Sequence, residues 1–223
     1  MPGVTEREYL RTTRAGYDAI AEEYAQRFAH ELANAPLDRA VMAAFAELVR
    51  RDHEAPEVLD VGSGPGEVTA HLEALGLSVR GVDLSPAMVG LARREHPSIE
   101  FGVGEMSALD VRDASLAGVS AWYSLIHVPA PDRPDVLAEL HRVLAPGGYL
   151  LLGFQVGDHT QHHDEAFGHA VTLDFHRLEP GAVVALLDDA GFEIVARTEK
   201  APEPHSRATP LPQGMLIARR PVR

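Results

Sequence analysis

The sequence predicts an α/β fold in which a mostly parallel sheet carries helices on both faces. Short apolar runs alternate with helical patterns from residue 57 onward, and strands that alternate with helices form parallel sheets covered on both faces. The last two apolar runs are joined by the proline-rich connection 201–212, which fits an antiparallel last strand. The chain has 223 residues, enough for one sizeable core, so a single domain over 1–223 is expected.

Two helices are expected before the first strand. The first has aromatic and apolar residues three or four apart on one face: Tyr9, Thr13, Tyr17, Ile20, Tyr24 and Phe28. The second covers 37–49, after a break around Pro36.

The remaining elements follow in alternation. Strands are expected near 57–61, 77–83, 99–103, 118–124, 148–155, 192–200 and 212–219. Helices are expected near 66–75, 85–95, 132–144 and 180–190. Residues 157–168 are polar and rich in histidine, which predicts a loop, and 170–176 could form an added strand.

Composition excludes several classes of protein. The net charge is −13, which argues against binding to nucleic acid or to an anionic membrane. The chain has no cysteine, so disulfides and thiolate chemistry are ruled out. It also has no apolar run long enough for a membrane helix and no signal-peptide core. We therefore expect a cytoplasmic protein, and the amino-acid usage suggests a bacterial source.

A glycine-rich turn follows the first strand. Gly62, Gly64 and Gly66 come directly after the buried run 58–61, and glycines let the backbone approach a ligand closely. The turn opens a helix, whose free N–H groups point into the same space. Asp83 closes the second strand, where a carboxylate can bind the two hydroxyls of a ribose. These features predict a nucleoside-binding site.

The residue after the third glycine indicates which nucleoside is bound. A dinucleotide turn has the pattern G-x-G-x-x-G, but its last position here holds Glu67. That carboxylate stands where a pyrophosphate would sit, which disfavours an NAD-dependent oxidoreductase. It suits a ligand that has no phosphate and carries a positive centre.

This arrangement resembles motif I of the class I S-adenosylmethionine-dependent methyltransferases. Residues 104–109 resemble the adenine-contacting block of that family, and 142–151 resemble its helix-turn-strand signature before the fifth strand. The resemblance covers roughly residues 55–155. It implies a Rossmann-like seven-stranded sheet with an antiparallel last strand, and S-adenosyl-L-methionine as the cofactor.

The resemblance also assigns roles to particular residues. Asp60 would orient the turn or receive the methionine ammonium, and Asp83 would bind the ribose, although it could instead cap the next helix. Glu105 would accept from the adenine amine, a position where many family members carry aspartate. The implied cofactor-binding residues are Tyr17, Tyr24, Asp60, Gly62, Ser63, Gly64, Gly66, Asp83, Leu84, Met88, Glu105, Met106 and Ser124.

Tyr17 and Tyr24 share a helix face, and the segment 17–24 resembles the lid of many small-molecule methyltransferases. The expected division is a helical lid in 1–53, a cofactor-binding core in 54–156, and a substrate-side loop with the C-terminal strands in 157–223. Both tyrosines could equally be core aromatics.

The methyl acceptor is expected beyond the carboxyl ends of the strands. His127, just after the fourth strand, is the candidate general base, or else a histidine that only packs the loop. The candidate acceptor residues are Phe154, Gln155, His169, His176 and Arg177. Arg177 could hold a carboxylate or phosphate, or pair with Glu179 at the surface. The histidines of 159–176 are loosely spaced, and no metal is expected.

The sequence thus favours methyl transfer to a small molecule, with oxygen preferred over nitrogen, in metabolite or natural-product tailoring. The alternatives are a non-catalytic S-adenosylmethionine-binding sensor or assembly protein, and the disfavoured oxidoreductase. No nucleic-acid or membrane partner is expected, and a homodimer is possible.

Overall fold

A seven-stranded sheet forms the centre of the computed structural model, which describes residues 7–202 and 211–222. The strand order is β3-β2-β1-β4-β5-β9-β8. The strands are β1 (Glu57–Val61), β2 (Ser78–Asp83), β3 (Glu100–Val103), β4 (Leu116–Trp122), β5 (Leu144–Gln155), β8 (Glu193–Lys200) and β9 (Gln213–Arg219). Only β9 runs against its neighbours β5 and β8. The predicted Rossmann-like sheet with an antiparallel last strand is confirmed.

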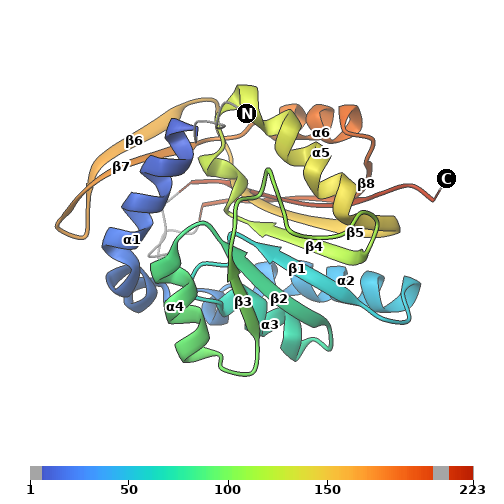
Figure 1. Cartoon of the computed structure of the whole chain (residues 1–223). Helices are drawn as coiled ribbons and strands as arrows, with labels where there is room; N and C mark the ends of the chain where they lie inside the picture. Colours follow the sequence, from blue (N-terminus) through green and yellow to red (C-terminus); the bar gives the residue numbers. More distant parts are fainter. Residues whose placement is uncertain (1–6, 203–210, 223) are drawn as a thin grey trace, which may run out of the picture.

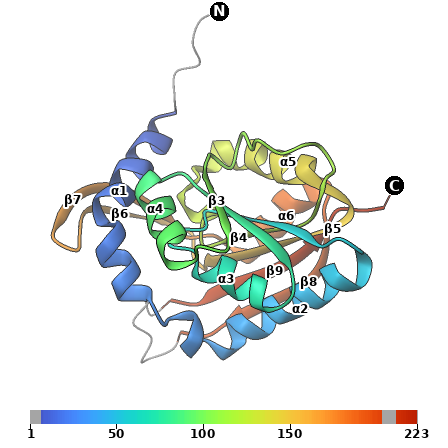
Figure 2. The ribbon, with the colours of Figure 1, turned by 60° about the horizontal axis from the view of Figure 1, so that its bottom comes forward.

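Helices cover both faces of this sheet (Figures 1 and 2). They are α1 (Glu8–Phe28), α2 (Pro36–Asp52), α3 (Glu67–Ala74), α4 (Pro86–Glu95), α5 (Arg133–Val143) and α6 (Pro180–Asp189). Apolar residues of α5 and α6 pack with one face of β1, β4 and β5, and those of α2 and α3 pack with the other. No helix among the described residues has the length and apolarity that a membrane crossing requires.

Most expected boundaries lie within two residues of the observed ones, but α2 continues beyond residue 49 to Asp52 and β5 begins at Leu144 rather than near residue 148. β4 stops at Trp122, because Tyr123 has a φ of +55° and leaves the strand direction. β5 begins at Leu144, directly after α5. The strained Tyr123 lies at the carboxyl end of the sheet, where left-handed backbone often marks a functional turn.

A two-stranded hairpin, β6 (Thr160–Ala166) and β7 (His169–His176), stands apart from the main sheet. The loop predicted for 157–168 is therefore wrong over 160–166, whereas the added strand is present. Every side chain of β6 is at least partly exposed, so the strand lacks the apolar alternation that signals a strand in sequence. Phe167 and Gly168 both have positive φ, the conformation that closes a two-residue hairpin.

Helix α1 lies between this hairpin and α4 (Figures 1 and 2). A Cβ on Gly16 would come within 2.7 Å of the Leu173 side chain on β7, so glycine allows the close approach. On the other side, the Asp18 carboxylate accepts hydrogen bonds from the Ser85 hydroxyl and from the Ala87 N–H, the latter at 3.1 Å. Contacts on both sides therefore hold α1 across the carboxyl ends of the strands.

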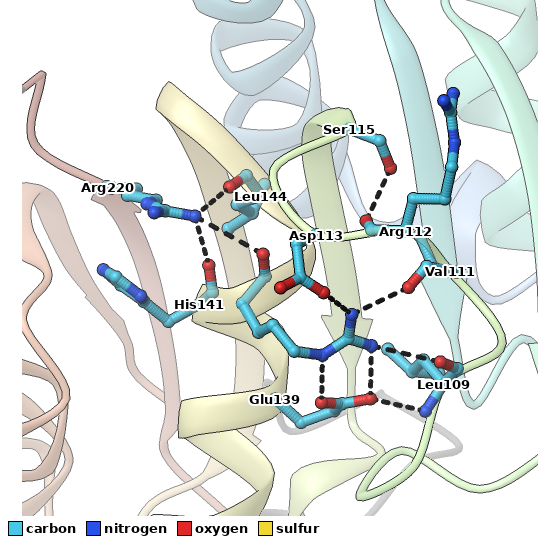
Figure 3. A network of polar contacts seen from close by, with 10 residues as sticks. Leu109, Val111, Arg112, Asp113, Ser115, Glu139, His141, Leu144 and Arg220 are labelled. Atoms are coloured by element: carbon cyan, nitrogen blue, oxygen red, sulfur yellow. Dashed lines mark hydrogen bonds and ion pairs between the residues drawn. The ribbon is translucent and has the colours of Figure 1, made fainter.

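Figure 3 shows Glu139 of α5 close to Leu109 of the loop between β3 and β4. The loop is also tied to α5 by Arg142. Its guanidinium pairs with Glu139 at 2.7 Å and donates to the carbonyls of Leu109 and Val111. Glu139 in turn accepts from the Leu109 N–H at 2.6 Å. Because this loop begins with residues 104–106, the network fixes one wall of the site described next.

Candidate cofactor and acceptor site

Two adjoining cavities open at the carboxyl ends of β1, β2 and β4. The smaller has a volume of about 110 Å³ and the larger of about 730 Å³. Each cavity has its own lining residues, but six residues line both and form a wall that the cavities share: Tyr17, Tyr24, Gly62, Gly64, Trp122 and Tyr123. The two cavities are therefore adjacent along these six residues.

The glycine turn brings bare backbone to the shared wall. Gly62 has a φ of +75°, and a Cβ there would lie 2.3 Å from the Cβ of Ser124. Ser124 is held in place because its hydroxyl donates to the Val61 carbonyl at 2.7 Å. Gly64 also has positive φ, but no atom would crowd a side chain there. Gly62 thus has both conformational and steric reasons to be glycine.

Gly66, the third glycine of the turn, packs against the protein interior. It lies outside both cavities and precedes α3 with a φ of +93°. A Cβ there would come within 2.8 Å of His96 and Phe101. Glycine is needed at this position for the close packing of the turn, and the role expected of Gly66 at the cofactor stays a prediction.

Asp83 is fixed at the edge of the smaller cavity. Its carboxylate accepts from the N–H groups of Gly64 and Ser85, each at 2.8 Å. Burial raises the pKa of Asp83, against the effect of these hydrogen bonds. The N-cap of α4 is Ser85, whose hydroxyl accepts from the Met88 N–H, so Asp83 is not itself the cap. Its remaining lone pairs are available for a ligand.

The other residues expected around a nucleoside line the same smaller cavity: Leu84, Met88, Glu105, Met106 and Ser124. Met88 is 1% exposed and packs against Tyr17 and Tyr24 of α1. Glu105 accepts a hydrogen bond from the Ser107 hydroxyl at 3.0 Å, which orients its carboxylate. These residues give the cavity an apolar lining with acids at Asp83 and Glu105.

Asp60 and Ser63 line the larger cavity rather than the smaller. Asp60 is buried, and its carboxylate accepts from the Thr69 hydroxyl at 2.7 Å. Burial raises the pKa of Asp60 to about 6. A buried carboxylate with a raised pKa is stabilised in its charged form by a cation, so Asp60 suits an ammonium group.

Tyr17 and His127 form a hydrogen-bonded pair between α1 and the turn after β4. The Tyr17 hydroxyl lies 2.8 Å from Nε2 of His127, and Nδ1 lies 3.0 Å from the Asp174 carbonyl. A carbonyl only accepts, so Nδ1 carries the proton and Nε2 accepts from Tyr17. Burial lowers the pKa of His127 to about 4, so the imidazole is neutral near pH 7.

The five expected acceptor residues are not brought together. Gln155 and Arg177 line the larger cavity, but Phe154 is 1% exposed within the apolar core. His169 is exposed and lies 3.4 Å from Glu23 on α1. His176 hydrogen-bonds Thr160 across the hairpin. All three lie outside both cavities. Phe154 points into the core, strand alternation places His176 on the opposite side from Phe175, and His169 lies next to the hairpin turn.

Sequence reasoning missed several residues of the two cavities. On α1, the predicted apolar face lines them along its length, with Tyr9 and Thr13 in the smaller and Ile20 and Phe28 in the larger. The helical spacing of these residues was a usable signal. Other missed residues are Trp122, Tyr123, Leu173, Phe175, Asp38 and Lys200. Among the described histidines and acids, no group of three or more could hold a metal ion.

Comparisons with known proteins agree with this geometry. Residues 58–148 match the model of a methyltransferase domain. A demethylmenaquinone methyltransferase of Chlorobaculum parvum is 33% identical over 136 residues, which are 59% of this chain and 55% of the relative. The N-demethylindolmycin N-methyltransferase of Streptomyces griseus is 29% identical over 80% of this chain and 86% of its own length. The chain spans about half the length of the Chlorobaculum relative.

A solved structure shows the same fold. The 1,6-didemethyltoxoflavin-N1-methyltransferase of Burkholderia thailandensis superposes with a TM-score of 0.66 at 24% identity, covering 99% of this chain and 92% of the other. That structure contains bound 1,6-didemethyltoxoflavin and S-adenosylhomocysteine. The sheet order, the glycine turn followed by Asp83 and the matched domain together define a methyltransferase domain. Over residues 58–148 the chain is similar to methyltransferase domains, and its fold is that of the S-adenosylmethionine-dependent methyltransferases.

Proposed function

We propose that this chain transfers a methyl group from S-adenosylmethionine to a small-molecule acceptor. The observation that carries the proposal is the Asp83 carboxylate, held by Gly64 and Ser85 at the edge of a cavity that shares a wall with a larger one. The smaller cavity suits a nucleoside, and the larger suits an acceptor.

The residues present fit the cofactor. Gly62 and Gly64 bring backbone without side chains to both cavities, Asp83 would bind the ribose hydroxyls, and Glu105 would accept from the adenine amine. Asp60 would receive the ammonium group, which would favour the charged form of this buried carboxylate. When bound, S-adenosylmethionine supplies an already activated methyl group, so the protein mainly has to align donor and acceptor.

The larger cavity supports an acceptor of metabolite size. Its volume of about 730 Å³ falls within the range of small-molecule sites, and apolar side chains such as Phe28, Leu173 and Phe175 line it. A non-catalytic cofactor sensor would not need an open acceptor cavity beside the cofactor site. Relatives named for indolmycin and toxoflavin intermediates support a role in natural-product tailoring.

The Tyr17–His127 pair supports oxygen over nitrogen as the acceptor atom. Tyr17 lines both cavities, and its hydroxyl proton is directed at Nε2 of His127. An acceptor hydroxyl could give its proton to the Tyr17 oxygen while Tyr17 gives its own to Nε2. Because burial lowers the pKa of His127, the imidazole is a weak base. The pair therefore suits an acceptor hydroxyl that is itself acidic, such as a phenol.

Helices α1 and α2 are proposed to act as the lid of this site. The contacts of Gly16 with β7 and of Asp18 with α4 keep α1 over both cavities. In that position α1 would shield the reacting groups from water.

The test is turnover with methyl-labelled S-adenosylmethionine and paired acceptors that share a ring but carry either a hydroxyl or an amine. We expect label in the phenols, with the rate reduced in His127→Asn and S-adenosylhomocysteine binding retained. Cofactor binding without transfer to any acceptor would favour a sensor, and preferred transfer to amines would overturn the assignment to oxygen.

A further inference from the structure

A buried arginine at the wall of the larger cavity has donors without partners. Arg177 is 5% exposed and lines this cavity. Its Nη2 donates to the Gln161 side chain on β6, whereas Nε and Nη1 are buried without a hydrogen-bond partner among the described residues. An arginine stays charged in a protein, so this is a buried cation with unused donors.

The position of Arg177 is set by the backbone around it. Its N–H donates to the His159 carbonyl at 2.8 Å, just after β7. Gly157 faces the base of its side chain, where a Cβ would lie 2.8 Å from the Arg177 Cβ. Glycine at 157 thus leaves the room that this side chain occupies, and the hairpin holds the guanidinium at the cavity.

No protein group of the described residues neutralises this charge. Burial lowers the pKa of Arg177, and no carboxylate is identified as raising it. Two acids of the same cavity have other partners: Asp38 pairs with Lys200 at 2.7 Å, and Asp60 accepts from Thr69. The alternative of a surface pair with Glu179 does not fit, because Arg177 is buried and Glu179 is exposed. A buried unpaired charge is costly, which makes an external anion the natural partner.

We infer that Arg177 is an oxyanion-binding residue of the acceptor site, and that the acceptor is an apolar, ring-containing molecule with a carboxylate or phosphate. The apolar body would lie against Phe175 and Leu173, which line the same cavity. The guanidinium would fix the charged end, so that the far end of the molecule faces the wall shared with the cofactor cavity. This inference rests on the proposed function, since it specifies the acceptor class of that site.

The test uses the whole protein without cofactor and follows its melting temperature against concentration of sodium benzoate, phenyl phosphate or benzyl alcohol at constant ionic strength. We expect saturable stabilisation by at least one anion and none by the neutral alcohol. The anion that stabilises more identifies carboxylate or phosphate as the preferred group. Arg177→Gln should weaken the anion's apparent affinity by about 10- to 100-fold.

Two controls distinguish a failure of the inference about Arg177 from a failure of the proposed function. Arg93→Gln removes an arginine that donates to the Phe101 carbonyl outside both cavities and should leave the anion response unchanged. S-adenosylhomocysteine should bind wild type and Arg177→Gln equally. Equal anion responses in wild type and Arg177→Gln, or no response in either, would overturn the inference even if the cofactor binds. Absent cofactor binding would instead overturn the proposed function.

Discussion

Tyr17 of α1 donates its hydroxyl proton to Nε2 of His127 across 2.8 Å, joining residues 110 positions apart in the sequence. The Asp174 carbonyl holds the opposite ring nitrogen, so one imidazole connects the helix, the turn after β4 and the hairpin. The same two rings contact edge to face, with centroids 5.2 Å apart. The candidate proton acceptor is therefore also a structural link between α1 and the core.

Removing the Tyr17 hydroxyl should show how much its hydrogen bond to His127 contributes to stability. Tyr17→Phe leaves Nε2 of His127 in a buried site without its donor, which should lower the free energy of unfolding by about 1–2 kcal/mol. Tyr24→Phe is the matched control, because the Tyr24 hydroxyl has no hydrogen bond among the described residues. Urea unfolding measures both, and equal losses would show that the Tyr17–His127 bond contributes nothing.

Stability should fall in acid because of His127. Burial lowers its folded pKa to about 4, whereas an unfolded histidine titrates near 6.5. Between these values the unfolded state binds the proton first, so stability is lost as the pH falls from about 6.5 toward 4, by up to about 3 kcal/mol. The difference in unfolding free energy between pH 7 and pH 4.5 should be smaller in His127→Asn. An unchanged difference would contradict the buried, neutral imidazole.

The contribution of Asp60 to stability should depend on pH in the opposite direction from that of His127. Burial raises its folded pKa to about 6, so the folded state favours the proton, and stability from this group is lost as the pH rises through 6. Asp60→Asn should therefore raise the melting temperature at pH 8 and change it little at pH 4.5. It should also weaken S-adenosylmethionine binding, if Asp60 receives the ammonium. A lower melting temperature at pH 8 would show that the charge at Asp60 stabilises the fold.

The two glycines of the turn should differ in their tolerance of a methyl group. Gly62→Ala places a Cβ 2.3 Å from Ser124 at positive φ, and strain plus overpacking should cost about 3 kcal/mol. Gly64→Ala meets no neighbour, so only the left-handed backbone should cost about 1 kcal/mol. Thermal unfolding of the two variants is the measurement. Equal losses would mean that contact with Ser124 does not constrain the turn.

The features predicted most reliably from the sequence are those that depend on the residues of a single helix, strand or turn. The buried run before Gly62, the acid at Asp83 and the helical spacing of Tyr17 and Tyr24 are local features, and they predicted the sheet, the turn and the apolar face of α1. The strand β6 was missed because both of its faces are polar or exposed, so no hydrophobic period distinguishes it from a loop.

Features that depend on distant parts of the chain could not be predicted in the same way. The hydrogen bond between Tyr17 and His127 depends on how α1 crosses the strand ends, and the sequence contains no sign of that crossing. Arg177 is buried because the hairpin folds over it, whereas its neighbour Glu179 suggested a surface pair. Arg177 directly follows β7. His176 of that strand is turned away from the cavity by strand alternation, and His169 lies next to the hairpin turn, beside Glu23 of α1.

The central claim is that Asp83 binds the cofactor, and calorimetric titration with S-adenosylhomocysteine tests it most directly. The comparison is wild type against Asp83→Asn, which keeps an oxygen for the Gly64 or Ser85 N–H but loses the charge. We predict binding by the wild type at a stoichiometry of about one, weakened about tenfold or more in the variant, since charge-assisted hydrogen bonds to the ribose are lost. Equal affinity in the two proteins, or binding of NAD in place of S-adenosylhomocysteine, would contradict the account.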